Sequence, residues 1–141
     1  MPNILVIDDE IKITKILEKF LTKSGFEVIK ISSGKEAIEF LNSEQKADLI
    51  IMDMKMPKIT GFDVLKEKQR LNDKTPTIIL TGSVDAEKYN KELNQFGFIL
   101  EDIVYKPLNL FMLLNKVEKK LGISPLIIAE TDKDVLQGKA G

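Results

Sequence analysis

The chain of 141 residues contains no cysteine and no histidine. The absence of cysteine excludes disulfide bonds, thiolate nucleophiles and cysteine-ligated metal sites. The absence of histidine excludes histidine metal ligands, catalytic triads that use histidine, and the side chain that most often acts as a general base. Any chemistry that this protein performs must therefore use carboxylates, hydroxyls and amines.

The chain also lacks an excess of charge of either sign and a long apolar run. Its 21 basic and 22 acidic residues leave a formal net charge of -1, which gives no overall attraction to nucleic acid or to an anionic membrane. No apolar run reaches the roughly 18 residues that a membrane-spanning helix needs, and the N-terminus lacks the pattern of a signal peptide. We therefore expect a cytoplasmic protein without membrane contact, and no direct binding of nucleic acid by this chain.

The apolar residues, 43% of the chain, follow two alternating patterns that predict strands and helices. Short apolar runs predict five strands, at residues 3–7, 26–31, 48–52, 77–80 and 103–105. Apolar residues at helical spacing predict five helices, at residues 11–23, 35–42, 62–71, 85–96 and 108–121. Strands that alternate with helices indicate a parallel sheet covered on both faces, which is an α/β doubly wound (βα)5 fold in a single domain.

Residues 123–141 differ in composition from the predicted domain at residues 1–122. They begin near a Ser-Pro pair, contain the apolar patch Leu126–Ala129 and end in small and polar residues. We expect an extra helix, a linker or a remnant of cloning, with the apolar patch packed on the domain or on a second copy of the chain. About 20 residues are too few for a typical effector domain, so the chain either acts through protein contacts or is a piece of a longer protein.

Four of the predicted strands end in polar residues, and in a parallel sheet these ends meet at one edge. The residues are Asp8 and Asp9, Asp53, Thr81 and Lys106. Ligands of such sheets bind beyond this edge. Gathered carboxylates repel one another unless a hard cation lies among them, and oxygen-only ligation suits Mg²⁺. A nearby ammonium and hydroxyl would stabilise a transferred phosphoryl group, and a carboxylate can itself be the nucleophile that accepts it.

Several of these side chains also have a simpler structural explanation. Asp8, Asp9 and Glu10 could cap the first helix and interact favourably with its dipole. Thr81 could cap the fourth helix, and Tyr105 could belong to the core. None of these explanations accounts for complementary groups at four strand ends, so the combination favours a functional site.

Four short motifs at these strand ends together resemble the receiver domain of two-component response regulators. The resemblance covers roughly residues 3–121. It implies a flavodoxin-like fold, in which a five-stranded parallel sheet of order 2-1-3-4-5 is combined with five helices. The motifs are IDDE at residues 7–10, DMKMPKITG at 53–61, TGS at 81–83 and YKP at 105–107.

The resemblance implies a role for each matching residue of the acidic site. Asp53 would be the phosphoacceptor. Asp8 and Asp9 would hold Mg²⁺, or Mn²⁺ in its place, together with the Asp53 side chain and the backbone carbonyl of Lys55. Lys106 would pair with the phosphoryl group.

Further residues match the part of the family that responds to phosphorylation. The Thr81 hydroxyl would bond a phosphoryl oxygen, and Tyr105 would be the switch aromatic that turns inward when Thr81 moves. Pro107 would follow a cis peptide bond. Gly82 stands where the family most often has alanine, so the phosphoryl group should be less shielded from water and short-lived.

The function implied by the resemblance is that of a phosphoprotein in a two-component phosphorelay, and not that of a multiple-turnover enzyme. A sensor histidine kinase or a phosphotransfer protein would donate the phosphoryl group to Asp53. The modified domain would then act on a downstream protein effector, or form a homodimer, through the face made by the fourth helix, fifth strand and fifth helix.

Two other functions compete with this interpretation. The first is an Mg²⁺-dependent phosphatase or phosphotransferase that forms an aspartyl phosphate, but Lys55 stands where such enzymes usually keep a second acid. The second is an unphosphorylated receiver-like scaffold, which would not need the intact set of acids. A Rossmann-type nucleotide binder is disfavoured because no Gly-x-Gly-x-x-Gly follows the first strand.

Overall fold

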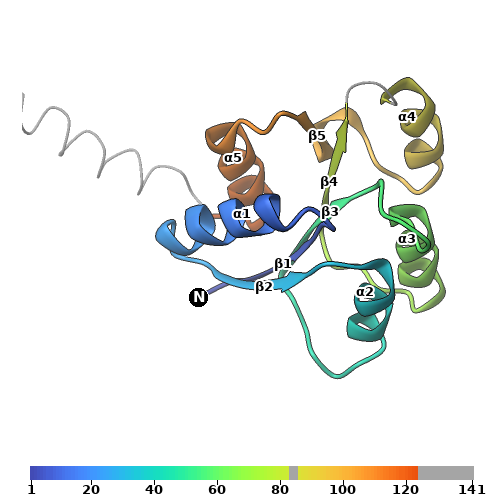
Figure 1. Cartoon of the computed structure of the whole chain (residues 1–141), viewed down its shortest axis with the longest axis horizontal. Coiled ribbons are helices and arrows are strands. Elements are labelled where there is room, and N and C mark those ends of the chain that lie inside the picture. The colour runs from blue at the N-terminus through green and yellow to red at the C-terminus, as the bar shows by residue number, and fades with distance from the viewer. Residues whose placement is uncertain (83–85, 124–141) are drawn as a thin grey trace, which may run out of the picture.

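A computed structural model describes residues 1–82 and 86–123 of the chain. These residues form a five-stranded parallel sheet of order β2-β1-β3-β4-β5 (Figure 1), which confirms the predicted fold class. The strands are β1 (Asn3–Ile7), β2 (Glu27–Ile31), β3 (Leu49–Asp53), β4 (Thr77–Gly82) and β5 (Ile103–Lys106). The helices are α1 (Ile11–Lys23), α2 (Gly34–Leu41), α3 (Gly61–Arg70), α4 (Ala86–Gln95) and α5 (Leu110–Leu121), with the short 3-10 helix η2 (Leu100–Asp102) before β5.

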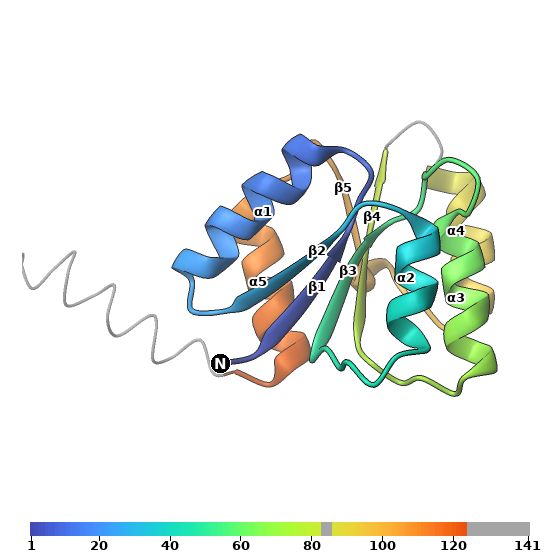
Figure 2. The same ribbon diagram turned by 60° about the horizontal axis from the view of Figure 1, so that its bottom comes forward.

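Both faces of the sheet are covered by helices. Helices α1 and α5 pack on one face, and α2, α3 and α4 pack on the other (Figure 2). Alternate residues of each strand therefore enter two different cores. In β1, Ile4 packs with the α1 and α5 side chains, and Leu5 packs with the α2, α3 and α4 side chains. This double burial explains why the strands appear in the sequence as unbroken apolar runs.

Capping side chains decide where two of the helices begin. The Ser33 hydroxyl accepts a hydrogen bond from the backbone N–H of Glu36 at 3.2 Å, so α2 begins at Gly34, one residue earlier than predicted. The Asn109 side chain accepts one from the backbone N–H of Met112 at 3.1 Å, so α5 begins two residues later than predicted. These polar caps satisfy backbone N–H groups that have no partner within the helix.

Strand β4 is longer than the sequence pattern indicated. We expected it to end at Leu80, with Thr81 in the following turn. Instead Thr81 pairs with Tyr105 of β5, and Gly82 pairs with Lys106. The expectation was wrong because a strand continues for as long as its neighbour supplies a partner, whether or not its own residues are apolar.

One other expectation differs from the structure between β4 and β5. The segment over residues 97–102, where no helix or strand is expected, contains η2, in which the Asp102 carboxylate accepts a hydrogen bond from the backbone N–H of Ile99 at 2.8 Å. Helix α4 packs on the sheet through Leu93, which is fully buried, and the ring of Phe62 on α3 lies 5.5 Å from that of Tyr89. Within the described residues, no helix combines the length and the apolar character needed to cross a membrane. Beyond Ile123, the predicted tail lies outside the residues that the structure describes.

Candidate functional site

Asp8, directly after β1, and Asp53, the last residue of β3, lie side by side at one edge of the sheet. Ile7 at the end of β1 pairs with Met52 of β3, so Asp8 and Asp53 are the next residues on two neighbouring strands. Strand β2 lies on one side of β1, whereas β4 and β5 lie beyond β3. The chain therefore changes its winding direction between β1 and β3, which is where ligands of doubly wound sheets bind.

Three carboxylates converge at this point. Asp8, Asp9 and Asp53 each offer an oxygen within 4.8 Å of the others. Asp8 is fully buried and Asp53 is 3% exposed. The Asp8 Oδ2 atom is buried and makes no hydrogen bond within the part of the chain that the structure describes. A divalent cation would satisfy this oxygen and reduce the repulsion between the carboxylates, so these residues fit Mg²⁺.

Among the described residues, Lys106 at the end of β5 is the only lysine whose ammonium contacts this cluster. Its Nζ lies 3.3 Å from Oδ1 of Asp53 and 3.2 Å from Oδ2 of Asp8. Burial lowers the pKa of Lys106, but a hydrogen bond to Glu10 and the charges of Asp53 and Asp8 outweigh this effect and raise its pKa overall. Lys106 is therefore charged at any physiological pH and is available to bind an anion.

Burial and mutual repulsion raise the pKa values of the two buried acids. The pKa of Asp53 rises to about 6, first because burial disfavours its charge and then because Asp8 repels it, with Lys106 opposing both effects. Burial also raises the pKa of Asp8, although the Glu10 backbone N–H and Lys106 favour its charged form. At neutral pH Asp53 is mostly an ionised carboxylate, which is the form that can act as a nucleophile.

The remaining predicted site residues lie around this centre. Thr81 is 1% exposed, and its hydroxyl donates a hydrogen bond to the Gly82 carbonyl at 3.3 Å. Its register partner Tyr105 is 38% exposed. Lys55 is exposed in the loop after β3. The Lys106–Pro107 peptide bond is cis.

Glu10 is a site residue whose contact the sequence did not indicate. We expected it at most to cap α1, but it occupies the N-cap position without making a side-chain capping bond. Instead its carboxylate accepts a hydrogen bond from Lys106 Nζ at 3.0 Å. The two residues are distant in the sequence, and no local pattern connects them.

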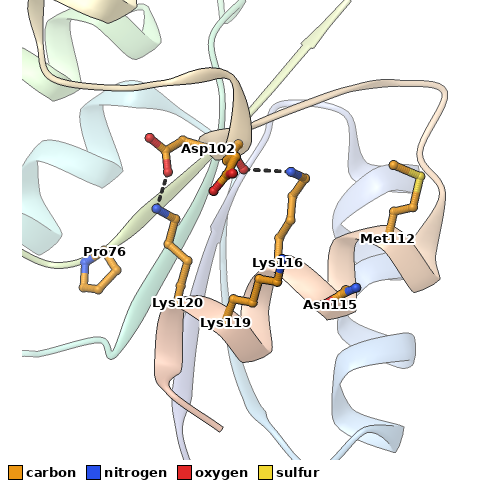
Figure 3. A pocket seen from close by; sticks show the side chains of 8 residues that line it. Pro76, Asp102, Met112, Asn115, Lys116, Lys119 and Lys120 are labelled. Atoms are coloured by element: carbon orange, nitrogen blue, oxygen red, sulfur yellow. Dashed lines mark hydrogen bonds and ion pairs between the residues drawn. The ribbon is translucent and has the colours of Figure 1, made fainter. Parts of the chain in front are cut away.

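A pocket of about 560 Å³ lies between α5 and η2 (Figure 3). It is near the N-terminal ends of β4 and β5, whereas the acidic cluster is at the C-terminal ends of the strands. Two of the pocket's three lysines are already engaged, since Lys120 forms an ion pair with Asp102 and Lys116 donates to the Glu101 carbonyl at 2.8 Å. The residue before β4, Pro76, also lines it. The chemistry of the acidic cluster, and not the presence of this depression, therefore identifies the functional site.

Comparison with known proteins agrees with this geometry. A family model for the response regulator receiver domain matches residues 4–118. Response regulator RR06 of Streptococcus pneumoniae is 34% identical over 116 residues, which cover 82% of this chain and 51% of that protein. The transcriptional regulatory protein ZraR of Escherichia coli is 34% identical over 129 residues, which cover 92% of this chain and 28% of that protein. The 3',5'-cyclic-nucleotide phosphodiesterase regA of Dictyostelium discoideum is 36% identical over 125 residues, or 84% of this chain and 15% of that protein.

Solved structures show the same relationship. The receiver domain of the Francisella response regulator 1452 has a TM-score of 0.77 at 29% identity, covering 86% of this chain and 98% of that one. A receiver domain protein from Clostridium thermocellum has a TM-score of 0.75 at 30% identity, covering 90% and 99%. The chain spans about half the length of RR06 and less of the other two curated relatives. By its sequence, its strand order and its converging acids, the chain belongs to the response regulator receiver domain family.

Proposed function

We propose that this domain is a phospho-accepting switch of a two-component system, with Asp53 as the phosphoacceptor. The observation that carries the proposal is the position of Lys106, whose Nζ lies 3.3 Å from the Asp53 carboxylate inside a cluster of three acids. An ammonium at this distance can pair with a phosphoryl group attached to Asp53. The proposal places the exchange in the cytoplasm, with a sensor histidine kinase or a phosphotransfer protein as the donor.

The proposed reaction is a transfer of one phosphoryl group between two nucleophiles. A carboxylate oxygen of Asp53 forms a bond to phosphorus while the bond from phosphorus to the donor breaks, and the donor leaves with the electron pair of that bond. Lys106 and the Thr81 hydroxyl stabilise the negative charge on the phosphoryl oxygens. A Mg²⁺ ion held by Asp8, Asp9, Asp53 and the Lys55 carbonyl would supply further neutralisation of this charge.

Phosphorylation of Asp53 would also change the surface of the domain. Thr81 and Tyr105 are register partners on β4 and β5, so a Thr81 side chain drawn toward a phosphoryl group leaves space into which Tyr105 can turn. That movement would change the face made by α4, β5 and α5. A downstream protein effector, or a second copy of the chain, would recognise the changed face.

The experiment is incubation with acetyl phosphate, with and without Mg²⁺, followed by intact mass measurement. We expect the mass of one phosphoryl group to appear only with Mg²⁺, and to be absent in Asp53→Asn. Beryllofluoride, which mimics the acyl phosphate, should bind the wild type and not Asp53→Asn. A chain that shows neither modification nor beryllofluoride binding would contradict the proposal and favour the scaffold alternative.

A further inference from the structure

The contact between Lys106 and Glu10 is the shortest of the three that Lys106 makes with acids. Its Nζ lies 3.0 Å from Glu10 Oε1, against 3.2 Å from Asp8 Oδ2 and 3.3 Å from Asp53 Oδ1. It is also the contact with hydrogen-bond geometry, whereas Asp8 Oδ2 makes no hydrogen bond within the described chain. The Glu10 side chain is 60% exposed and the Lys106 side chain 19% exposed, so Glu10 is the more solvent-accessible member of the pair.

The backbone around Glu10 is held from both sides. Its N–H donates to Asp8 Oδ1 at 2.9 Å, and its carbonyl accepts from the N–H groups of Ile13 and Thr14 at the start of α1. These bonds hold the main chain of Glu10 beside the site and leave its side chain free to reach Lys106. An ordinary surface ion pair contributes little to stability. What distinguishes this pair is that Lys106 also contacts Asp8 and Asp53, which are buried acids of the site.

We propose that Glu10 is a positioning residue that holds the Lys106 ammonium at the mouth of the site before phosphorylation. It has to release Lys106 when a phosphoryl group arrives. The incoming group is a dianion and competes with the Glu10 carboxylate for the same N–H donors. This inference rests on the proposed function, because it concerns the way in which Lys106 becomes available to the phosphoryl group.

Glu10 also adds a fourth carboxylate around a single ammonium. Small anionic phosphodonors therefore meet a site that repels them until Lys106 turns toward them. Removing one charge several ångströms from the incoming phosphorus changes the affinity for such an anion by about 3-fold at low ionic strength. The side chain of Glu10 thus favours the unphosphorylated state of the site.

The test compares wild type with Glu10→Gln in acetyl phosphate phosphorylation at saturating Mg²⁺ and low ionic strength. We expect the half-saturating acetyl phosphate concentration to fall about 3-fold, with a smaller change in the maximal rate. Beryllofluoride should bind Glu10→Gln tighter by a similar factor. Both differences should shrink with added salt. The control is Glu27→Gln, which removes the same charge from an exposed position at the opposite end of the sheet.

A second measurement examines the contact without any phosphodonor. Urea unfolding of the metal-free wild type, Glu10→Gln, Lys106→Met and the double variant gives the coupling between the two side chains. We expect Glu10→Gln to shift the unfolding midpoint in a more stabilising direction in the Lys106→Met background than in the wild type. The reason is that only repulsion from the three aspartates then remains for Glu10.

The outcomes separate this inference from the proposed function. A wild type that is neither phosphorylated nor able to bind beryllofluoride would overturn both. A phosphorylated wild type whose half-saturating concentration is the same in Glu10→Gln, with no coupling to Lys106, would overturn only the role of Glu10. A loss of maximal rate in Glu10→Gln with no change in half-saturation would also overturn it, since Glu10 would then act only by supporting Asp8.

Discussion

The phenolic oxygen of Tyr105 on β5 lies 3.3 Å from the side-chain nitrogen of Asn90 on α4, and this hydrogen bond links the two elements. Tyr105 is at the same time the register partner of Thr81. The same side chain therefore contacts α4 through its hydroxyl and neighbours Thr81 through its backbone. In the proposed switch, any inward turn of Tyr105 must break the bond with Asn90.

Removing this bond should favour the inward state of Tyr105. A neutral hydrogen bond contributes about 1 kcal/mol, so Asn90→Ala should raise the ratio of inward to outward Tyr105 about fivefold. The measurement is ¹⁹F NMR of protein labelled with fluorotyrosine, with the Tyr105 resonance assigned from Tyr105→Phe. The control is Asn94→Ala, an exposed position one turn later on α4. A Tyr105 resonance that does not move in Asn90→Ala would contradict the prediction.

Asp53→Asn should stabilise the metal-free protein. A raised aspartate pKa means that the charged form is less favourable in the folded state, so the cost is present above the folded pKa of about 6 and disappears as the pH falls below it. At pH 7 we expect the free energy of unfolding to rise by about 3 kcal/mol, measured by urea unfolding. Added Mg²⁺ should stabilise the wild type more than the variant. Equal stability of the two proteins at pH 7 without metal would show that the Asp53 charge has no cost.

Gly82→Ala should prolong the life of the acyl phosphate. A Cβ built at Gly82 meets no heavy atom of the described residues within 4 Å, so the methyl group fits against them without strain. It would add apolar cover at the end of β4, next to Thr81, and slow the approach of water. The measurement is the rate at which the phosphoryl mass disappears after the donor is removed, with urea unfolding to verify that the fold is unchanged. A lifetime equal to that of the wild type would contradict the prediction.

Asp73→Asn should destabilise the protein in a pH-dependent way. Lys68 is 7% exposed, and its Nζ donates to Asp73 Oδ1 at 2.9 Å and to the Thr75 carbonyl at 3.0 Å. Burial raises the pKa of Asp73, but the hydrogen bonds from Lys68 and Thr75 outweigh it and lower the pKa overall. The stabilisation is therefore complete above the unfolded pKa of about 4 and is lost as the pH falls through the lower folded value.

For this variant we expect a loss of about 3 kcal/mol at pH 7, because the Lys68 charge would remain buried without its partner. The difference from the wild type should shrink when urea unfolding is repeated near pH 3. Glu27→Gln again serves as the control for a change of surface charge. A difference that stays constant between the two pH values would show that the ionised form of Asp73 is not what stabilises the loop.

Much of the fold could be predicted because its signals are local. Strands that are buried on both faces appear as unbroken apolar runs, and helices with one buried face appear as apolar residues at helical spacing. The errors lie at element ends. Strand β4 continues to Gly82 because β5 supplies partners for it, and α5 begins after Asn109 because that side chain caps it. Both depend on geometry that apolar patterns do not contain.

The sequence alone determined which residue types stand at the ends of the strands. Asp8, Asp53 and Lys106 follow apolar runs, and the rule that parallel strands end at one edge was enough to place them together. Tertiary structure alone decided which acid Lys106 bonds and how far Tyr105 is exposed. A long side chain such as that of Lys106 can reach several acids on different strands and loops. Which of them it bonds depends on the distances between these groups in the folded chain.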